Sequence, residues 1–206
     1  MHEQRLTEAT VAAAADLLPG CGSLIVVREA KVGIGKPDLI LMRVDLPRLA
    51  LRRAAGLRLS NYQEAVALRA FRDGRADDLA LSASYVRRLK RTLVDRGWFD
   101  LGDMDKAITH SLVVEAKLTD WRRAVGQLAQ VRWAASLAAL AVPHRLAPRI
   151  PSSVLERRGM GIIAVDDLGS TAWSRLSEPD DLPFELDGWL GELAIREIES
   201  PTSPRP

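Results

Sequence analysis

The chain has 206 residues, of which 47% are hydrophobic and 27% are charged, so it is long and apolar enough to bury a core of its own. Its single cysteine excludes an internal disulfide and a zinc site built from cysteines. No apolar run approaches the ~20 residues of a membrane span, and the first residues lack the basic-then-apolar layout of a secretory signal. We therefore expect a cytoplasmic protein that does not contact a membrane.

The formal net charge of +2 is small, but the charges are unevenly distributed along the chain. Residues 58–98 contain nine basic and five acidic side chains, whereas residues 178–199 contain eight acidic side chains and one basic one. A basic middle followed by an acidic end predicts one surface that faces a polyanion.

The first part of the chain predicts a helix followed by two strands. Residues 7–18 have apolar side chains at helical spacing, with Thr7 as a plausible cap and a Pro-Gly pair as the end. Residues 24–28 and 38–44 are short apolar runs separated by a glycine-containing turn at 33–37. We expect both runs to be strands that are buried on at least one face.

A segment that is predicted to be nearly all helix lies between residues 47 and 105. We expect helices at 61–72, 76–81 and 84–96, the first ended by an Asp-Gly pair and the last by a glycine. Apolar and aromatic side chains would close a small three-helix core, made of Leu79, Val86, Leu89, Leu93 and Trp98. The segment interrupts the chain where a hairpin tip would lie, and such tips tolerate insertions best.

The α/β pattern resumes after this segment. Residues 108–116 have strand character and residues 120–132 follow as a helix, while residues 136–142 either extend that helix or form a strand. Two further strands and a final helix are predicted at 161–165, 171–176 and 188–198. Alternating strands and helices indicate an α/β fold, and the serine- and proline-rich residues 200–206 are predicted to be a disordered tail.

Two acidic residues and a lysine stand where strands can bring them together. Asp38 opens one predicted strand, and Glu115 and Lys117 end another as Glu-Ala-Lys. Side chains two residues apart on a strand point to the same face, so Glu115 and Lys117 would project together, and Asp38 would join them if the two strands pair. Carboxylates hold divalent cations such as Mg²⁺, and a nearby lysine can orient or deprotonate a water molecule.

The order Pro-Asp38, then Glu115-Ala-Lys117, then a helix with Gln127 resembles the PD-(D/E)xK superfamily of nucleases, whose members are restriction-enzyme-like or Holliday-junction-resolvase-like. The resemblance implies a restriction-endonuclease-like mixed sheet flanked by helices. It also implies that Asp38 and Glu115 bind Mg²⁺ or Mn²⁺, that Lys117 is catalytic and that Gln127 supports the site or contacts DNA.

Some members of the superfamily add an acidic metal ligand from the first helix. The best match for this ligand is Glu8, and Glu3 is the runner-up. A second Glu-x-Lys at residues 29–31 precedes the Pro-Asp pair instead of following it, so we interpret it as a chance occurrence.

The inserted helical segment resembles a winged helix-turn-helix. Three helices with a basic third one, followed by Gly-Trp-Phe at 97–99, are typical of that family, in which the third helix lies in the major groove of DNA. The candidate DNA-contacting side chains are Ser82, Ser84, Tyr85, Arg87, Arg88 and Arg91. The expected wing at residues 100–106 contains three aspartates and little strand character, which predicts that it is short or absent.

The two resemblances imply a discontinuous nuclease-like domain of residues 1–46 and 106–199, with the winged helix-turn-helix inserted as residues 47–105. The leading hypothesis is a divalent-metal-dependent DNA endonuclease, or a nuclease subunit, whose inserted helices position the DNA. The alternative is a catalytically inactive regulator or scaffold that keeps the nuclease fold and binds DNA. A third hypothesis makes the insert a dimerisation element, which would give a homodimer.

Overall fold

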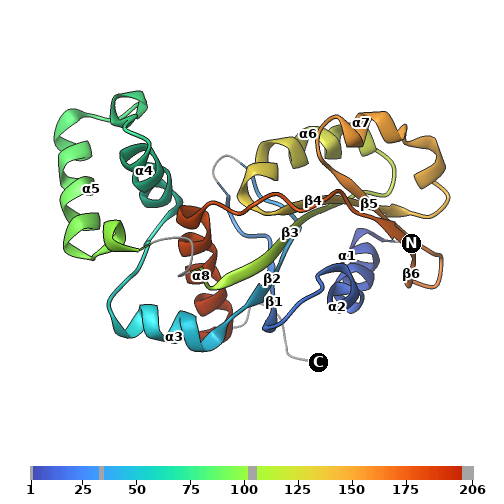
Figure 1. Ribbon diagram of the computed structural model, residues 1–206. Helices are drawn as coiled ribbons and strands as arrows, with labels where there is room; N and C mark the ends of the chain where they lie inside the picture. The colour runs from blue at the N-terminus through green and yellow to red at the C-terminus, as the bar shows by residue number, and fades with distance from the viewer. Residues whose placement is uncertain (1, 33–34, 102–105, 201–206) are drawn as a thin grey trace.

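Six strands pair into one mixed sheet in the computed structural model, which describes residues 2–32, 35–101 and 106–200 (Figure 1). The strands lie side by side in the order β1 to β6, with the bounds Ser23–Arg28, Leu39–Val44, Ile108–Ala116, Leu137–Pro143, Gly161–Val165 and Thr171–Arg175. Pairing is parallel between β3 and β4 and between β4 and β5, and antiparallel between the other neighbours. The predicted α/β class is confirmed, and residues 137–143 form a strand rather than an extended helix.

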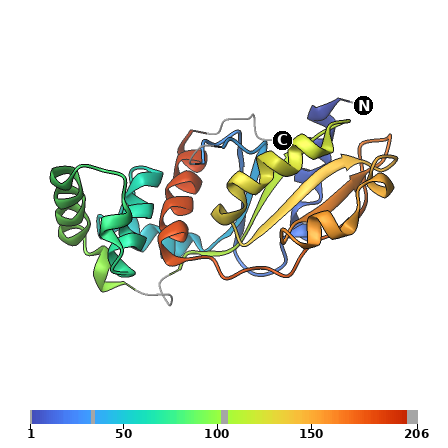
Figure 2. The same cartoon turned by 90° about the horizontal axis from the view of Figure 1, so that it is seen from above.

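Helices flank the sheet on both faces. The bounds of α1 to α8 are Glu3–Ala12, Ala14–Leu17, Leu46–Ala54, Tyr62–Arg72, Ala83–Asp95, Trp121–Val131, Ser152–Glu156 and Phe184–Glu199. On one face, Leu6 of α1 and Leu17 of α2 lie in one apolar cluster with side chains of β2 and β3. On the other face, Leu128 of α6 and Leu190 of α8 lie in the larger apolar cluster, and α6 crosses the strands obliquely (Figure 2).

β2 is apolar on both sides because both of its faces are buried. Leu39 and Leu41 face α1 and α2, whereas Ile40 and Met42 belong to the core under α6 and α8. A slip of one residue in the pairing would turn each of these side chains to the opposite face. The register of β2 against β3 is therefore strongly specified, and it decides which side chains meet at the end of these strands.

The insert places α4 and α5 beside α8, on the side away from the sheet (Figures 1 and 2). It contains α3, α4 and α5 together with two 3₁₀ turns, Ala76–Asp78 and Trp98–Asp100. Leu89 and Leu93 are buried as predicted, but Trp98 packs against Phe184 of α8, with ring centroids 5.7 Å apart. A Cβ atom on Gly188 would lie 2.7 Å from the Trp98 ring, so glycine makes room for it. The expected separate three-helix core is thus part of the main core.

The first helix begins earlier than the sequence pattern predicts. α1 starts at Glu3, so Thr7 lies inside the helix and is not its cap. The Thr7 hydroxyl instead donates a 2.7 Å hydrogen bond to the carbonyl oxygen of Gln4, a local bond that this residue type often makes. The helix is interrupted at Ala13, which separates α1 from the short α2.

Several helical segments also differ from the prediction. α3 and α7 have no counterpart among the predicted elements, although Asp45 is a good capping residue for α3. Where a helix is predicted at 76–81, only a 3₁₀ turn at Ala76–Asp78 forms, because the backbone becomes extended at Leu79 and Ser82 already caps α5. Leu79 and Val86 are consequently only half-buried.

The last helix is longer than predicted, since α8 starts at Phe184 directly after Pro183. Most of the expected wing, at 102–105, and most of the expected tail, at 201–206, lie outside the described residues. Within the described ranges, no helix is long and apolar enough to cross a membrane.

Candidate functional site

The pairing of β2 with β3 makes Asp38 and Glu115 neighbours. Leu39 lies opposite Val114, so the next residues along the two strands, Asp38 and Glu115, also face each other across the ladder. Oδ2 of Asp38 accepts a 2.7 Å hydrogen bond from the backbone N–H of Ala116. This bond fixes the start of β2 to the end of β3, and it holds one carboxylate beside the Glu-Ala-Lys segment.

Lys117 lies among three carboxylates. Its Nζ is 3.4 Å from Oε1 of Glu115, 3.9 Å from Oδ2 of Asp38 and 3.7 Å from Oε1 of Glu3. The Glu115 side chain is 3% exposed, whereas the Lys117 and Asp38 side chains are 20% and 30% exposed. We call these four residues the acid–lysine cluster. One acid is nearly removed from water, while the others open to solvent at the edge of the sheet.

The pKa of Glu115 is raised from its ordinary 4.5 to about 7. Burial is the main cause, because it disfavours the charged form, and the negative charge of Asp38 adds to the shift. The ammonium group of Lys117 opposes the shift without cancelling it, and Glu3 adds to it. Carboxyl groups with a pKa near neutrality are concentrated at functional sites, and a cation that reached this one would compete with its proton.

The two candidate acids of the first helix lie differently. Glu3, in the first turn of α1, contacts Lys117. Glu8 is exposed and accepts a 2.8 Å hydrogen bond from the side-chain amide of Gln4. Five residues of α-helix correspond to a rotation of about 140°, so Glu3 and Glu8 point to different sides of α1.

Gln127 lies on α6, the helix that follows the Glu-Ala-Lys segment and packs on β3 and β4. The residue is half-buried, and its amide oxygen is buried without a hydrogen-bond partner in the described part of the chain. An unpaired buried acceptor costs free energy of the order of 1–3 kcal/mol. No hydrogen bond joins Gln127 to the acid–lysine cluster among the described residues.

The predicted DNA-contacting residues lie on α5 and just before it. Ser82 and Ser84 are occupied locally: Ser82 caps the helix through the backbone N–H of Tyr85, and its hydroxyl is 3.2 Å from that of Ser84. Arg88 lies over the Tyr85 ring, 4.8 Å from its centroid, and Tyr85 is half-buried.

The outer face of α5 carries unpaired cations. The arginines at 87, 88 and 91 are exposed, and among the described residues no carboxylate comes within 4.0 Å of any of them. Leu89 and Leu93, on the same helix, are buried. α5 therefore has an apolar inner face and a basic outer face, the arrangement that a surface helix needs in order to present charge to a polyanion.

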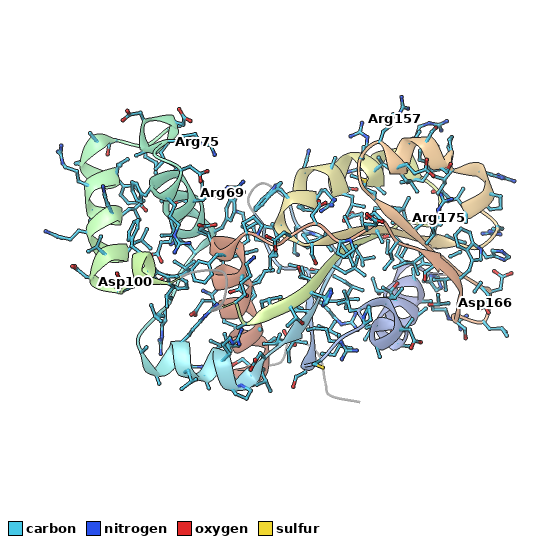
Figure 3. The ribbon with its side chains drawn as sticks, in the orientation of Figure 1. Arg69, Arg75, Asp100, Arg157, Asp166 and Arg175 are labelled. Atoms are coloured by element: carbon cyan, nitrogen blue, oxygen red, sulfur yellow. The ribbon has the colours of Figure 1, made fainter. Side chains whose placement is uncertain are left out.

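Other basic residues of the insert are used within the protein. Arg69 and Arg75 both pair with Asp73, at 3.8 Å and 2.7 Å, and lie on the same end of the insert (Figure 3). Arg72 pairs with a glutamate of α8 at 3.5 Å, and Arg96 pairs with Glu64 at 3.0 Å. The excess positive charge of the segment is thus concentrated on α5, which the sequence count alone does not reveal.

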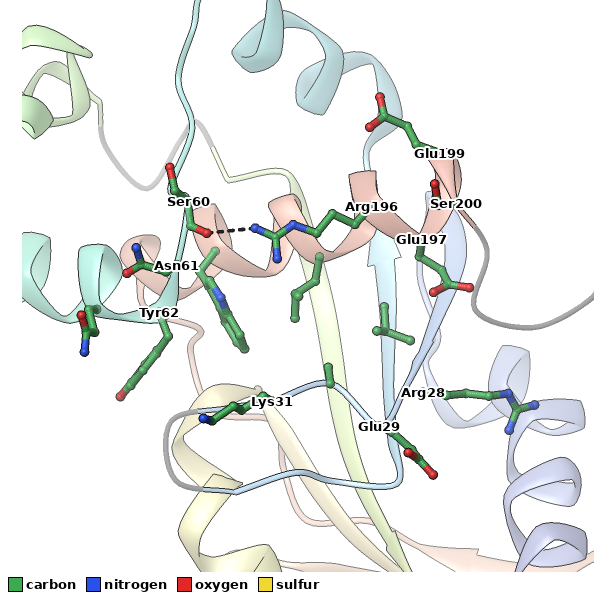
Figure 4. A pocket seen from close by; sticks show the side chains of 15 residues that line it. Arg28, Glu29, Lys31, Ser60, Asn61, Tyr62, Arg196, Glu197, Glu199 and Ser200 are labelled. Carbon is green, nitrogen blue, oxygen red and sulfur yellow. Dashed lines mark hydrogen bonds between the residues drawn. The ribbon is translucent and has the colours of Figure 1, made fainter.

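A hollow of about 1150 Å³ lies between the loop after β1, the start of α4 and the end of α8 (Figure 4). Its charged lining is balanced, with Arg28, Lys31 and Arg196 against Glu29, Glu197 and Glu199. Glu29 pairs with Lys36, and Arg196 donates a 2.9 Å hydrogen bond to the carbonyl oxygen of Ser60. The second Glu-x-Lys, at 29–31, therefore borders this hollow and not the acid–lysine cluster.

A smaller hollow, of about 330 Å³, lies immediately beyond Lys117. Its lining is Leu118, Thr119, Arg145, Leu146 and Arg149. The sequence patterns do not single out either arginine. Their position just after β4, which runs parallel to β3, could have indicated a binding site. Ligands of open α/β sheets bind beyond the carboxyl ends of such strands.

Oxygen donors dominate the acid–lysine cluster, but within the described ranges no group of three or more His, Cys, Asp or Glu side chains is arranged to hold a metal ion. The comparisons with known proteins add no family: no family model, no curated protein and no solved structure matches the chain.

Proposed function

We propose that the chain is a divalent-metal-dependent DNA endonuclease, or a nuclease subunit, of the PD-(D/E)xK type. The observation that carries the proposal is the meeting of Asp38, Glu115 and Lys117 at one edge of the sheet, from two strands that are separated by the whole insert. A solvated Glu-Lys pair on a protein surface would not explain the burial of Glu115 or its raised pKa. On this proposal the sheet is restriction-endonuclease-like and the insert is a winged helix-turn-helix.

The donor set suits Mg²⁺ or Mn²⁺. Both ions take oxygen ligands, and Mg²⁺ is usually held by one or two carboxylates while it keeps several waters. Asp38 and Glu115 would hold the ion, and Glu3 would join them in preference to Glu8, because Glu3 is the acid that contacts Lys117. When bound, the ion supplies positive charge that stabilises the negative charge developing on a phosphate.

The residues of the chain would contribute position and charge. The Lys117 ammonium, held 3.4 Å from Glu115, can donate hydrogen bonds to a phosphate oxygen or orient a water molecule beside it. The hydrogen bond from Ala116 to Asp38 keeps that carboxylate at the same edge. Gln127, with its unpaired amide oxygen, would support the site or contact DNA.

The basic outer face of α5 would position the duplex. Arginines that lack a carboxylate partner are free to bind phosphates or the edge of guanine. Of the predicted contacts, Arg87, Arg88 and Arg91 meet this condition, whereas the Ser82 hydroxyl is engaged in capping the helix.

Plasmid cleavage tests the proposal. Supercoiled DNA would be incubated with the protein and Mg²⁺ or Mn²⁺, and nicked or linear products would be followed with time. Lys117→Ala and Glu115→Gln should each reduce the rate at least a hundredfold. Lys31→Ala and Glu29→Gln alter the second Glu-x-Lys and are the matched controls, which should cut at the wild-type rate. Wild-type cleavage by Lys117→Ala would refute the assignment.

A second candidate is a regulator or scaffold that keeps the fold and binds DNA without cutting it. It is favoured by the three exposed arginines of α5, which can bind DNA whether or not the acid–lysine cluster holds a metal. It predicts salt-sensitive DNA binding through Arg87, Arg88 and Arg91 and no metal-dependent product from plasmid or branched DNA. The same cleavage assay therefore separates the two candidates.

A further inference from the structure

The smaller hollow lies next to the acid–lysine cluster in the chain and in space. Leu118 and Thr119, which follow Lys117 directly, form one wall, and the segment after β4 forms the other. The backbone N–H of Lys117 donates a 3.0 Å hydrogen bond to the carbonyl oxygen of Ala141, which ties the end of β3 to β4. The hollow is thus held at a fixed place beside Lys117, at the carboxyl ends of two parallel strands.

The lining of this hollow is suited to an anion. It contains no acidic side chain, and its polar groups are the Thr119 hydroxyl and the guanidinium groups of Arg145 and Arg149. Both arginines are exposed, and among the described residues neither has a carboxylate within 4.0 Å or a side-chain hydrogen bond. The larger hollow, by contrast, has as many acids as cations in its lining.

The backbone that carries the two arginines is fixed by short-range hydrogen bonds. The N–H of Leu146 donates to the carbonyl oxygen of Pro143 at 2.8 Å, and the N–H of Arg149 donates to that of Leu146 at 2.9 Å. Ala147 and Ile150 of the same turn are buried. The turn therefore presents both guanidinium groups from a rigid base, which lowers the entropy lost when they bind a ligand.

We propose that this hollow binds a phosphate group of a DNA strand, next to the phosphate that lies at the acid–lysine cluster. Guanidinium groups bind phosphate oxygens with paired, charge-assisted hydrogen bonds. A strand whose scissile phosphate is beside Lys117 would place a neighbouring phosphate over Thr119. The proposal rests on the proposed nuclease-like site. It adds a contact that would fix which phosphate of the DNA strand lies at the acid–lysine cluster.

DNA binding tests the proposal without any need for cleavage. Anisotropy of a fluorescent duplex would be measured in EDTA at several salt concentrations for Arg145→Gln, Arg149→Gln and the double variant. Loss of one phosphate contact should make the slope of log K against log salt shallower by about 0.9. Affinity at a fixed salt concentration should fall about tenfold for the double variant. Arg158→Gln, an exposed arginine outside the hollow, is the matched control and should leave both quantities unchanged.

Two further arms identify the phosphate. A duplex with neutral methylphosphonate linkages at successive positions should show one position where the double variant no longer weakens binding. A duplex with a terminal 5′-phosphate should bind no tighter than one with a 5′-hydroxyl. If the 5′-phosphate raises the affinity of the wild type but not of the double variant, the hollow binds the phosphate at a strand end, and the proposed internal phosphate is refuted.

The outcomes separate this site from the nuclease activity. If the double variant binds with the affinity and salt slope of Arg158→Gln, the phosphate site is refuted, whether or not the protein cleaves DNA. If binding weakens as expected but plasmid is never cut, the site stands and only the nuclease activity fails. If the wild-type protein does not bind the duplex, the phosphate site is refuted, and plasmid cleavage alone decides the nuclease activity.

Discussion

Ionisation of Glu115 should make the free energy of unfolding depend on pH, and Glu115→Gln should remove this dependence. In the folded protein its pKa is raised from 4.5 to about 7, so the folded state binds this proton more tightly than the unfolded state. The free energy of unfolding therefore falls as the pH rises from about 4.5 to about 7. Above pH 7 it stays at this lower value, because Glu115 is then ionised in both states. A shift of this size corresponds to about 3 kcal/mol.

Glu115→Gln keeps the shape of the neutral carboxyl group and cannot ionise. At pH 8 the variant should therefore be more stable than the wild type by up to about 3 kcal/mol, or roughly 6–12 °C in melting temperature. At pH 4.5 the two should differ by less than about 0.5 kcal/mol, since Glu115 is then mostly neutral in the folded state. Glu29→Gln, which changes an exposed acid with a lowered pKa, is the control and should not reproduce this pattern.

Urea unfolding at the two pH values, without divalent cations, measures the difference. A free-energy difference between wild type and Glu115→Gln that is the same at pH 4.5 and pH 8 would refute the reasoning. A second titration tests the metal assignment: Mg²⁺ at 100 times its dissociation constant should stabilise the wild type by about 2.7 kcal/mol at pH 8. It should stabilise Glu115→Gln much less, because one of its ligands has lost its charge.

Three further predictions concern the insert and its attachment. Asp187→Ala should lower the free energy of unfolding, measured by chemical denaturation, by about 3–5 kcal/mol. The reason is that the substitution removes the carboxylate that lies 2.6 Å from the buried guanidinium group of Arg52. A decrease of less than about 1 kcal/mol would show that the ion pair is dispensable. Trp98→Ala should also cost about 3–5 kcal/mol, and it should increase protease cleavage within the insert; unchanged proteolysis would mean that other contacts hold the insert on α8. Combined Arg87→Gln and Arg91→Gln should reduce the salt dependence of duplex binding while leaving the melting temperature within about 2 °C, and an unchanged salt slope would remove α5 from the DNA-binding surface.

The strand pattern was the most informative part of the sequence. Alternation predicts that Glu115 and Lys117 project together, and pairing of two apolar runs predicts that Asp38 joins them. These are local rules, and the neighbouring positions of the three residues follow them. The burial of Glu115 could not be derived in the same way, because it depends on how helices pack against the sheet.

The helix boundaries limited what could be inferred about the fourth acid. A helix that is predicted to start at Thr7 contains Glu8 but not Glu3. The helix in fact starts at Glu3, and Glu3 is the acid that contacts Lys117. The signal at the end of a helix is weak when, as at His2, no side chain caps it.

The packing of the insert was also beyond local rules. Helical periodicity identifies the inner face of α5, but Leu89 and Trp98 fit equally well in a small independent core or in a larger shared one. The deciding feature is Gly188 on α8, where the missing side chain admits the indole ring. The residues around Trp98 do not indicate that its ring packs on a glycine that lies about ninety positions later in the sequence.

The buried carboxylate of Asp187 has a consequence for the order in which the chain can assemble during translation. It accepts hydrogen bonds from the backbone N–H groups of Ala107 and Ile108, where the insert rejoins the sheet, and it pairs with Arg52 on the helix by which the insert leaves it. Asp187 of α8 therefore binds both ends of the insert. The ribosome synthesises α8 after all the elements that Asp187 contacts. A nascent chain that ends before α8 carries the helices of the insert on unsecured connections, so the insert can be locked in place only late in synthesis.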